Sequence, residues 1–119
     1  MPSMSRSIGR HYESIAEELL AGLGYQVLER NFTCRGGEID LVCLDGEVLV
    51  FVEVRGRKDA SHGAAEETVD WYKQRRTIRA AWAYLIRRGL GEPACRFDVV
   101  GIDARGARLY RDAFDGFTA

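Results

Sequence analysis

Two carboxylates in the middle of the chain have the spacing to bind one metal ion. Asp40 lies in one segment with strand-like alternation and Glu53 in the next, and Asp45-Gly46 between them favours a tight hairpin turn. A two-residue turn there pairs Leu44 with Glu47. Asp40 and Glu53 then become diagonal neighbours on one side of the sheet, roughly 7–8 Å apart between Cα atoms. Carboxylates at that separation reach a common point between them.

The hydrophobic pattern of residues 36–57 indicates that these acids need a partner. Alternate residues form an uninterrupted apolar face that predicts a core: Ile39, Leu41, Cys43, Val48, Val50, Val52 and Val54. The face with the acids is also largely apolar, so we expect it to be covered: Val42, Leu44, Leu49 and Phe51. Buried like charges repel each other unless a cation lies among them, and Mg²⁺ accepts one or two carboxylates plus waters and phosphate oxygens. The alternative is two solvated acids on the open face of an antiparallel sheet.

Length, charge and cysteine content limit the classes of protein to which this chain can belong. The 119 residues predict one domain over 9–119 after a flexible tail at 1–8. A formal net charge of -1 gives no overall signal for nucleic acid, so such a partner needs a local basic patch. Three widely separated cysteines argue against a zinc ribbon or a disulfide framework and fit a reducing cytosol. Without a membrane-spanning or signal-peptide stretch, a cytoplasmic location and no membrane partner are expected.

Periodicity predicts the order helix, three strands, helix, two strands. The first helix is expected from about Gly9 to Leu23 and the first strand from Tyr25 to Asn31, before the central hairpin. The second helix is expected over 66–88, and the last strands over 96–103 and 107–111. The strand at 96–103 is apolar on both sides, which predicts an interior position in the sheet.

Several charged residues outside the hairpin are candidates for the same site. Glu13 lies at the edge of the apolar stripe of the first helix and is placed to reach the hairpin acids, whereas Glu18 points to solvent. That all glutamates of this helix are solvated is an equally good interpretation. After the hairpin, a glycine-rich basic stretch with Arg57 and Lys58 predicts a loop beside the acids.

The second helix combines an apolar stripe with a basic face. The stripe is expected to pack on the sheet: Trp71, Gln74, Ile78, Ala81, Trp82 and Leu85. The opposite face mixes cations with tyrosines: Lys73, Arg76, Arg79, Arg87, Tyr72 and Tyr84. Such a face can follow a phosphate backbone, although a charged face is also the usual exterior of a helix. Lys73 lies at the edge of this face.

Taken in order, these motifs resemble the YraN family of small bacterial proteins. The resemblance rests on Gly37-Glu38-Ile39-Asp40, Val50-Phe51-Val52-Glu53-Val54-Arg55, Glu13-x-x-Ala16, Gly24-Tyr25, Arg30-Asn31, Lys73 and Cys95-Arg96-Phe97-Asp98-Val99-Val100. That family is similar to the PD-(D/E)xK nucleases and to archaeal Holliday-junction resolvases. The resemblance implies an α/β, restriction-endonuclease-like fold of three layers, with a mixed sheet of about five strands flanked by helices.

The resemblance also implies roles for the site residues. Asp40 and Glu53 correspond to the metal ligands of such nucleases, and Glu13 to an additional acid near the metal. Arg55 stands where these nucleases carry a lysine that orients or activates the attacking water. Arginine stays charged and cannot act as a base at neutral pH, but it can hold the phosphate or stabilise the transition state. Lys73 and Lys58 are candidates to supply the missing amine.

Two functions follow as expectations. The first is a DNA endonuclease that uses Mg²⁺ or Mn²⁺, acts on branched or structured DNA and supports its metal ligands through Glu38. Its DNA contacts are expected from a set of basic residues: Arg35, Arg57, Lys58, Lys73 and Arg76. The second is a non-catalytic DNA- or protein-binding module of the same fold, in which Arg55 marks lost chemistry. Related junction-cutting enzymes work as dimers, so the first function also implies a homodimer.

Overall fold

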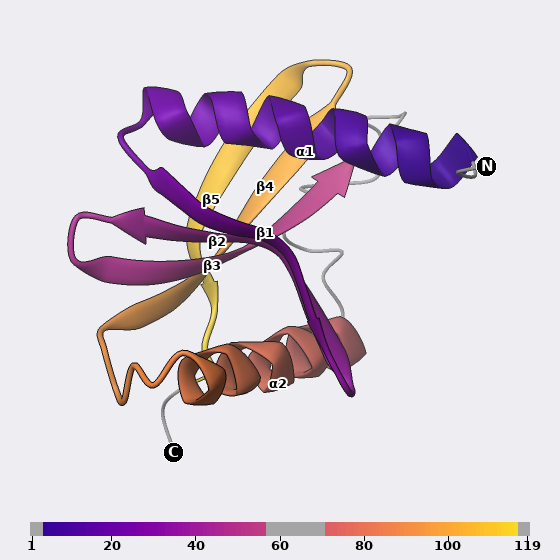
Figure 1. Ribbon diagram of the computed structural model, residues 1–119. Helices are drawn as coiled ribbons and strands as arrows, with labels where there is room; N and C mark the ends of the chain where they lie inside the picture. Colours follow the sequence, from indigo (N-terminus) through magenta and orange to yellow (C-terminus); the bar gives the residue numbers. More distant parts are fainter. Residues whose placement is uncertain (1–3, 57–70, 117–119) are drawn as a thin grey trace.

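Five strands form one sheet with a helix on each of its faces (Figure 1). The computed structural model describes residues 4–56 and 71–116, with the side chains of the first helix described from residue 10. The elements are α1 (Met4–Gly22), β1 (Gln26–Cys34), β2 (Gly37–Asp45), β3 (Val48–Gly56), α2 (Trp71–Arg87), β4 (Cys95–Asp103) and β5 (Gly106–Phe114). The predicted order of helices and strands is therefore confirmed.

The sheet is mixed, as expected. Its strand order is β1-β2-β3-β4-β5. All neighbours are antiparallel except β3 and β4, which are parallel because the chain crosses over through α2 between them. The predicted interior position of β4 is confirmed, and Val99 and Val100 are fully buried there. No helix of the described residues has both the length and the apolar character needed to cross a membrane.

Two apolar layers hold the helices to the sheet. Between α1 and the sheet lie Ala16, Leu20, Tyr25, Leu41, Cys43, Val50, Val52, Val100 and Ile102. Between α2 and the sheet lie Phe32, Ile39, Val42, Leu49, Phe51, Ala80, Ala81, Tyr84, Leu85 and Phe97. The second face of the hairpin is thus covered, as predicted. The placement of Ile39 with Leu41 was wrong, because Ile39 packs beside its β1 partner Phe32 under α2.

The hairpin register differs from the prediction by two residues. Asp45 pairs with Val48 and Leu44 with Leu49, so the loop consists of Gly46 and Glu47. The predicted pairing of Leu44 with Glu47 is wrong. A shift of two preserves the alternation of faces, since strand side chains alternate with a period of two, and Ile39 is the exception already named.

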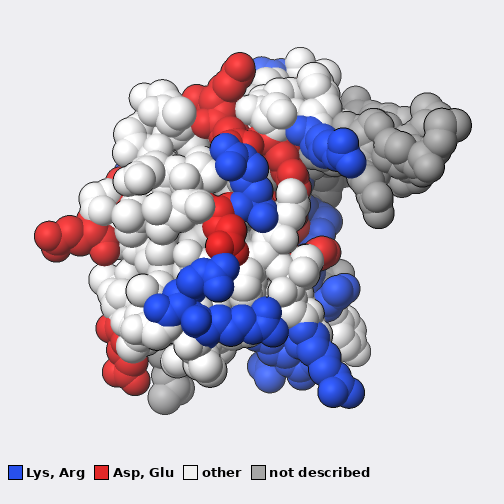
Figure 2. All heavy atoms as spheres, in the orientation of Figure 1, with Lys and Arg blue, Asp and Glu red and all other residues white. Residues whose placement is uncertain are grey.

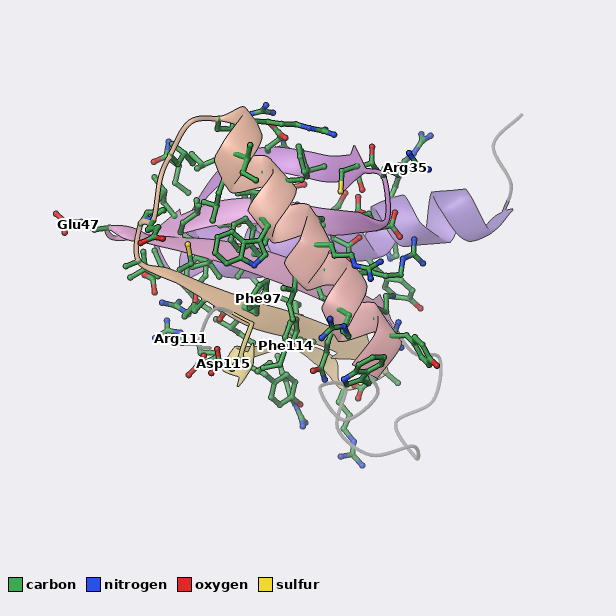
Figure 3. The ribbon with its side chains drawn as sticks, turned by 90° about the horizontal axis from the view of Figure 1, so that it is seen from below. Arg35, Glu47, Phe97, Arg111, Phe114 and Asp115 are labelled. Carbon is green, nitrogen blue, oxygen red and sulfur yellow. The ribbon has the colours of Figure 1, made fainter. Side chains whose placement is uncertain are left out.

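Three predicted boundaries also change. α1 begins at Met4, five residues before the predicted start at Gly9. β1 continues to Cys34 because its pairing with β2 extends through Cys34 and Gly37, which shortens the predicted turn to Arg35 and Gly36. β5 extends to Phe114, whose ring stacks on Phe97 with centroids 4.7 Å apart (Figure 3). The predicted start of α2 at residue 66 lies outside the described residues.

The buried side of α2 is rotated from its predicted stripe. Its buried residues are Thr77, Ala80, Ala81, Tyr84 and Leu85. Trp71 and Trp82 are 61% and 41% exposed, so their placement on the sheet was wrong. Small side chains at positions 77, 80 and 81 let the helix approach the sheet more closely than two indoles would permit.

A buried polar network lies on the side of the sheet that α1 covers. Asp98 is fully buried, and its carboxylate accepts hydrogen bonds from the Tyr25 hydroxyl (2.8 Å), Arg96 Nε (3.0 Å) and the backbone N–H of Asp112 (2.9 Å). Arg96 also forms an ion pair with Asp45 at 2.6 Å. Because this buried carboxylate is fully partnered within the protein, the network is structural.

Two glycines allow the helices to approach the sheet closely. A Cβ at Gly37 would lie 2.0 Å from the backbone oxygen of Arg76 in α2. A Cβ at Gly56 would lie 2.1 Å from the ring of Tyr12 in α1. Gly37 opens β2 and Gly56 closes β3, so the helices are held near the strand segments that carry Asp40 and Glu53.

We expect Gly37→Ala to lower the free energy of unfolding by about 1–3 kcal/mol, because the methyl group meets rigid helix backbone. Gly22→Ala is the matched control, since a Cβ there meets nothing within 4 Å. Urea unfolding of both variants measures the difference. Equal stability of Gly37→Ala and wild type would contradict the close approach of α2 to β2.

Candidate functional site

Asp40 and Glu53 face each other across β2 and β3. The last recorded pair of this ladder is Leu41 with Val52, and the next position outward brings Asp40 opposite Glu53 rather than diagonal to it. The two side chains form a hydrogen bond with each other. Asp40 Oδ2 also accepts a 2.8 Å hydrogen bond from the backbone N–H of Val54. The predicted meeting of the two acids is therefore confirmed, in a tighter arrangement than the predicted register implied.

The surroundings of this acid pair disfavour a double negative charge. Glu53 is only 2% exposed. Burial, followed by the nearby charge of Glu53, raises the pKa of Asp40 from its ordinary value of 3.8 to about 7. The Val54 N–H and the Lys73 charge oppose this rise without cancelling it. Two carboxyl groups in such contact retain one proton between them until a cation replaces it.

Lys73 of α2 provides a positive charge at this pair. Its Nζ lies 2.6 Å from Glu53 Oε1, and its side chain is about one-third exposed whereas that of Glu53 is almost completely buried. The backbone oxygen of Lys73 accepts a 3.0 Å hydrogen bond from Thr77 Oγ1, and Thr77 is buried against the sheet. Lys73 therefore extends from an anchored helical turn toward Glu53. The sequence predicted Lys73 at the edge of a helix face, as a DNA contact and as a candidate for the amine missing at position 55, but not its contact with Glu53.

A small hollow beside the acid pair brings several predicted residues together. Its lining consists of Glu38, Glu53, Lys73, Arg76 and Thr77. Glu38, expected to support the metal ligands, and Arg76, expected to contact DNA, thus both border the site. The hollow opens between β2, β3 and the first turns of α2.

Glu13 of α1 reaches toward the acids, as predicted. Burial raises the pKa of Glu13, a hydrogen bond from Asn31 (3.3 Å) lowers it, and the charges of Asp40 and Glu38 raise it further. Glu18 is exposed, as expected. Over residues 4–56 and 71–116, however, no three His, Cys, Asp or Glu side chains gather closely enough to hold a metal ion. The Glu13 carboxylate instead accepts a hydrogen bond from Asn31, which leaves Asp40 and Glu53 as the close pair.

The remaining basic candidates fall at different distances from the pair. Arg55 is half-buried on β3, two residues after Glu53 and on the same side of the strand. Arg35 is exposed at the turn from β1 to β2, at the opposite end of the sheet from Glu47 (Figure 3). The side chain of Arg79 lies against this turn, 3.7 Å from the position of a Cβ at Gly36. Arg57 and Lys58 lie outside the described residues.

The arrangement has the donor chemistry of a divalent-cation site. Burial and the adjacent charge of Glu53 disfavour the charged form of Asp40, so a cation with oxygen preference would gain two ligands and relieve their repulsion. Waters and substrate phosphate oxygens would complete the coordination of Mg²⁺, which rarely takes all its ligands from protein. Asp40 and Glu53 are the residues that would hold it.

Comparison with known proteins identifies similar chains in many bacteria. Residues 12–102 match the model of the uncharacterised protein family UPF0102. A UPF0102 protein of Anaeromyxobacter sp. (strain Fw109-5) is 47% identical, over 93% of this chain and 86% of its own length. One of Symbiobacterium thermophilum is also 47% identical, over 93% and 98% respectively. One of Stutzerimonas stutzeri is 49% identical, over 87% and 88%.

The stability of the metal-free protein should contain a pH-dependent contribution from Asp40. The folded protein keeps this proton up to a pKa of about 7, whereas the unfolded chain loses it near 3.8, so the contribution is lost as pH rises between these values. One extra bound proton gives a slope of at most about 1.4 kcal/mol per pH unit. We expect Asp40→Asn, which does not titrate, to lack this slope.

Urea unfolding of wild type and Asp40→Asn across that pH range, in EDTA, measures the difference. Glu47→Gln is the matched control, because Glu47 is an exposed acid at the other end of the sheet. Parallel pH profiles for wild type and Asp40→Asn would contradict the raised pKa.

Proposed function

We propose that this protein, which belongs to the UPF0102 family, is a metal-dependent DNA endonuclease. The YraN family that its motifs resemble is the same family. The reaction is hydrolysis of a phosphodiester bond, with branched or structured DNA among the substrates. The observation that carries this proposal is the contact of three groups from three elements. Asp40 of β2 lies opposite Glu53 of β3, and Nζ of Lys73 from α2 lies 2.6 Å from Glu53 Oε1.

In this proposal Asp40 and Glu53 hold Mg²⁺ or Mn²⁺. The bound cation supplies a water of lowered pKa and polarises the phosphate. Lys73 brings to Glu53 the amine that the sequence lacks at position 55, although it comes from a helix rather than from β3. Its Nζ has donors to orient a water or a phosphate oxygen beside Glu53. Glu13 and Glu38 add negative charge around the pair, which favours a cation there.

Basic residues around the hollow support DNA as the partner. Figure 2 shows Lys and Arg side chains gathered on the α2 side of the molecule. Around the site this basic patch consists of Arg35, Arg76 and Arg79, which come from the β1–β2 turn and from α2. Arg55 lies two residues after Glu53 on the same side of β3, and a guanidinium there would offer a phosphate a bidentate partner. A local basic patch of this kind can attract DNA even though the net charge of the whole chain is -1.

Location and assembly belong to the same proposal. The three cysteines are free thiols, which supports a reducing cytoplasm. Cutting both strands of a symmetric junction needs two active sites, so we infer a homodimer on that substrate.

A second candidate function is a non-catalytic DNA- or protein-binding module. The favouring observation is that Lys73 already compensates the charge of Glu53. A pair neutralised in this way, beside an arginine at position 55, is compatible with binding DNA phosphates without cutting them. The two functions differ in whether Asp40 and Glu53 are needed for any measurable effect on DNA.

Cleavage of labelled linear, flapped and four-way-junction DNA with Mg²⁺ or Mn²⁺ tests the proposal. We expect Asp40→Asn and Glu53→Gln to reduce cutting to background and Lys73→Ala to reduce it by about 100-fold, the lower end of the cost of removing one positioned hydrogen-bond donor. Glu47→Gln, remote from the site, should cut like wild type.

The same substrates separate the two functions. Metal-dependent cutting that disappears in both acid variants supports the nuclease. Salt-sensitive binding by wild type without any cutting supports the non-catalytic module. Cutting that survives in Asp40→Asn and Glu53→Gln would contradict the assignment of the active site.

A further inference from the structure

Two aromatic side chains at the start of α2 are exposed without any core to pack on. Trp71 is 61% exposed and Tyr72 is 75% exposed. Their ring centroids lie 5.2 Å apart in an edge-to-face arrangement of 80°. Trp71 was expected to pack on the sheet, but the close approach of α2 leaves that surface to Thr77, Ala80 and Ala81. The two rings therefore form an exposed pair, which we call the aromatic pair.

The aromatic pair is surrounded by positive charge. The guanidinium carbon of Arg75 lies 5.0 Å from the centroid of the Trp71 ring. Arg76 follows on the exposed surface of the helix, at the edge of the hollow beside the acids. A ligand matched to this surface combines a flat aromatic face with negative charge. Nucleotides have both properties.

The aromatic pair is also close to the candidate active site along the helix. Lys73, the next residue after Tyr72, contacts Glu53 at 2.6 Å. Tyr72 and Arg76 are four positions apart and therefore lie on the same side of α2, and Arg76 lines the hollow together with Lys73 and Glu53. A nucleotide stacked on Tyr72 would therefore lie beside the hollow.

We propose that Trp71 and Tyr72 stack with unpaired nucleobases, so that this protein recognises DNA through a single-stranded segment next to the acid pair. Bases inside a duplex are already stacked on both sides, whereas an unpaired base offers a free face to Trp71 or Tyr72. Every base has such a face, so the contact tolerates any sequence. Arg75 and Arg76 contact the phosphates on either side. Delivery of this strand to Asp40 and Glu53 rests on the proposed function; the stacking does not.

The charge around the aromatic pair favours nucleic acid over a protein partner. Trp, Tyr and Arg are also enriched in protein interfaces, but α2 carries basic residues and no acid from Trp71 to Arg87, which suits phosphate groups. The buried centre of a protein interface is more apolar than the rest of the surface. The other end of α2 has more of that character, with a cavity of about 220 Å³ lined by Trp82, Leu85, Glu92, Pro93 and Cys95. Around Trp71, in contrast, the guanidinium group of Arg75 lies over the ring. Trp82 therefore serves as an internal control on the same helix.

Tryptophan fluorescence tests the stacking directly. The chain has two tryptophans, so Trp82→Phe leaves Trp71 as the reporter. The probes are a thymidine oligomer of about 15 nucleotides, near the upper end of single-strand site sizes, an abasic oligomer of equal length and a blunt duplex. EDTA replaces divalent cations so that cleavage plays no part. We expect the thymidine oligomer to quench Trp71 and the abasic oligomer to leave its emission unchanged.

Affinity for a fluorescently labelled thymidine oligomer gives the second measurement. Trp71→Ala should weaken binding by ~5- to 100-fold, the range for loss of one base–aromatic stack. Trp71→Phe should restore most of the affinity, and Trp82→Phe should bind like wild type. Affinity for the abasic oligomer and the duplex should change much less in Trp71→Ala.

Three results would overturn the inference. The first is equal affinity of Trp71→Ala and wild type for the thymidine oligomer. The second is that Trp71→Ala loses as much affinity for the abasic oligomer as for the thymidine oligomer. The third is that the wild-type protein binds none of these DNAs. The last result would leave the aromatic pair to a protein partner. If Trp71 is quenched but no DNA is ever cut, the inference stands and the nuclease proposal fails. If cutting requires Asp40 but Trp71→Ala binds the thymidine oligomer like wild type, the nuclease proposal stands and the stacking inference fails.

Discussion

Two carboxyl groups facing each other inside an apolar sheet are the constraint around which this protein is built. Burial and the adjacent charge of Glu53 disfavour the charged form of Asp40 and raise its pKa to about 7. Lys73 relieves part of this repulsion, but only because α2 passes close enough for a 2.6 Å contact with Glu53. Gly37 and the small buried residues of α2 make that approach possible. The acid pair, the glycine and the helix therefore form one unit.

The helix α2 serves the site through both of its sides. Its buried side, with Thr77 and Ala80, sets the height of the helix above the sheet. Its exposed side carries the aromatic pair and a series of arginines around the same hollow (Figure 2). In the proposal, binding and chemistry would thereby depend on one rigid element, which keeps their relative geometry constant. The polar network around Asp98 stabilises the other side of the sheet and is fully partnered within the protein.

Much of this arrangement was predictable from the chain alone, because strand alternation is a local property. The order of elements, the interior position of β4 and the common side of Asp40 and Glu53 follow from periods of two and 3.6 residues. The exact hairpin register did not follow, since a turn at Asp45-Gly46 and one at Gly46-Glu47 are both compatible with the same alternation. The predicted buried stripe of α2 was wrong because it was chosen by hydrophobicity, which favours Trp71 and Trp82. Close packing against the sheet requires small residues instead.

The sequence by itself identified the candidate site residues: an acid on each strand of a hairpin, a glutamate on the first helix and a lysine on the second. Only the tertiary structure decided which of them touch. Lys73 and Glu53 are twenty positions apart and meet through the crossover between parallel strands, a contact that no local pattern encodes. Glu13 approaches the acids but its carboxylate bonds to Asn31. Local periodicity sets the face of each side chain, whereas helix-to-sheet packing sets the distance between faces.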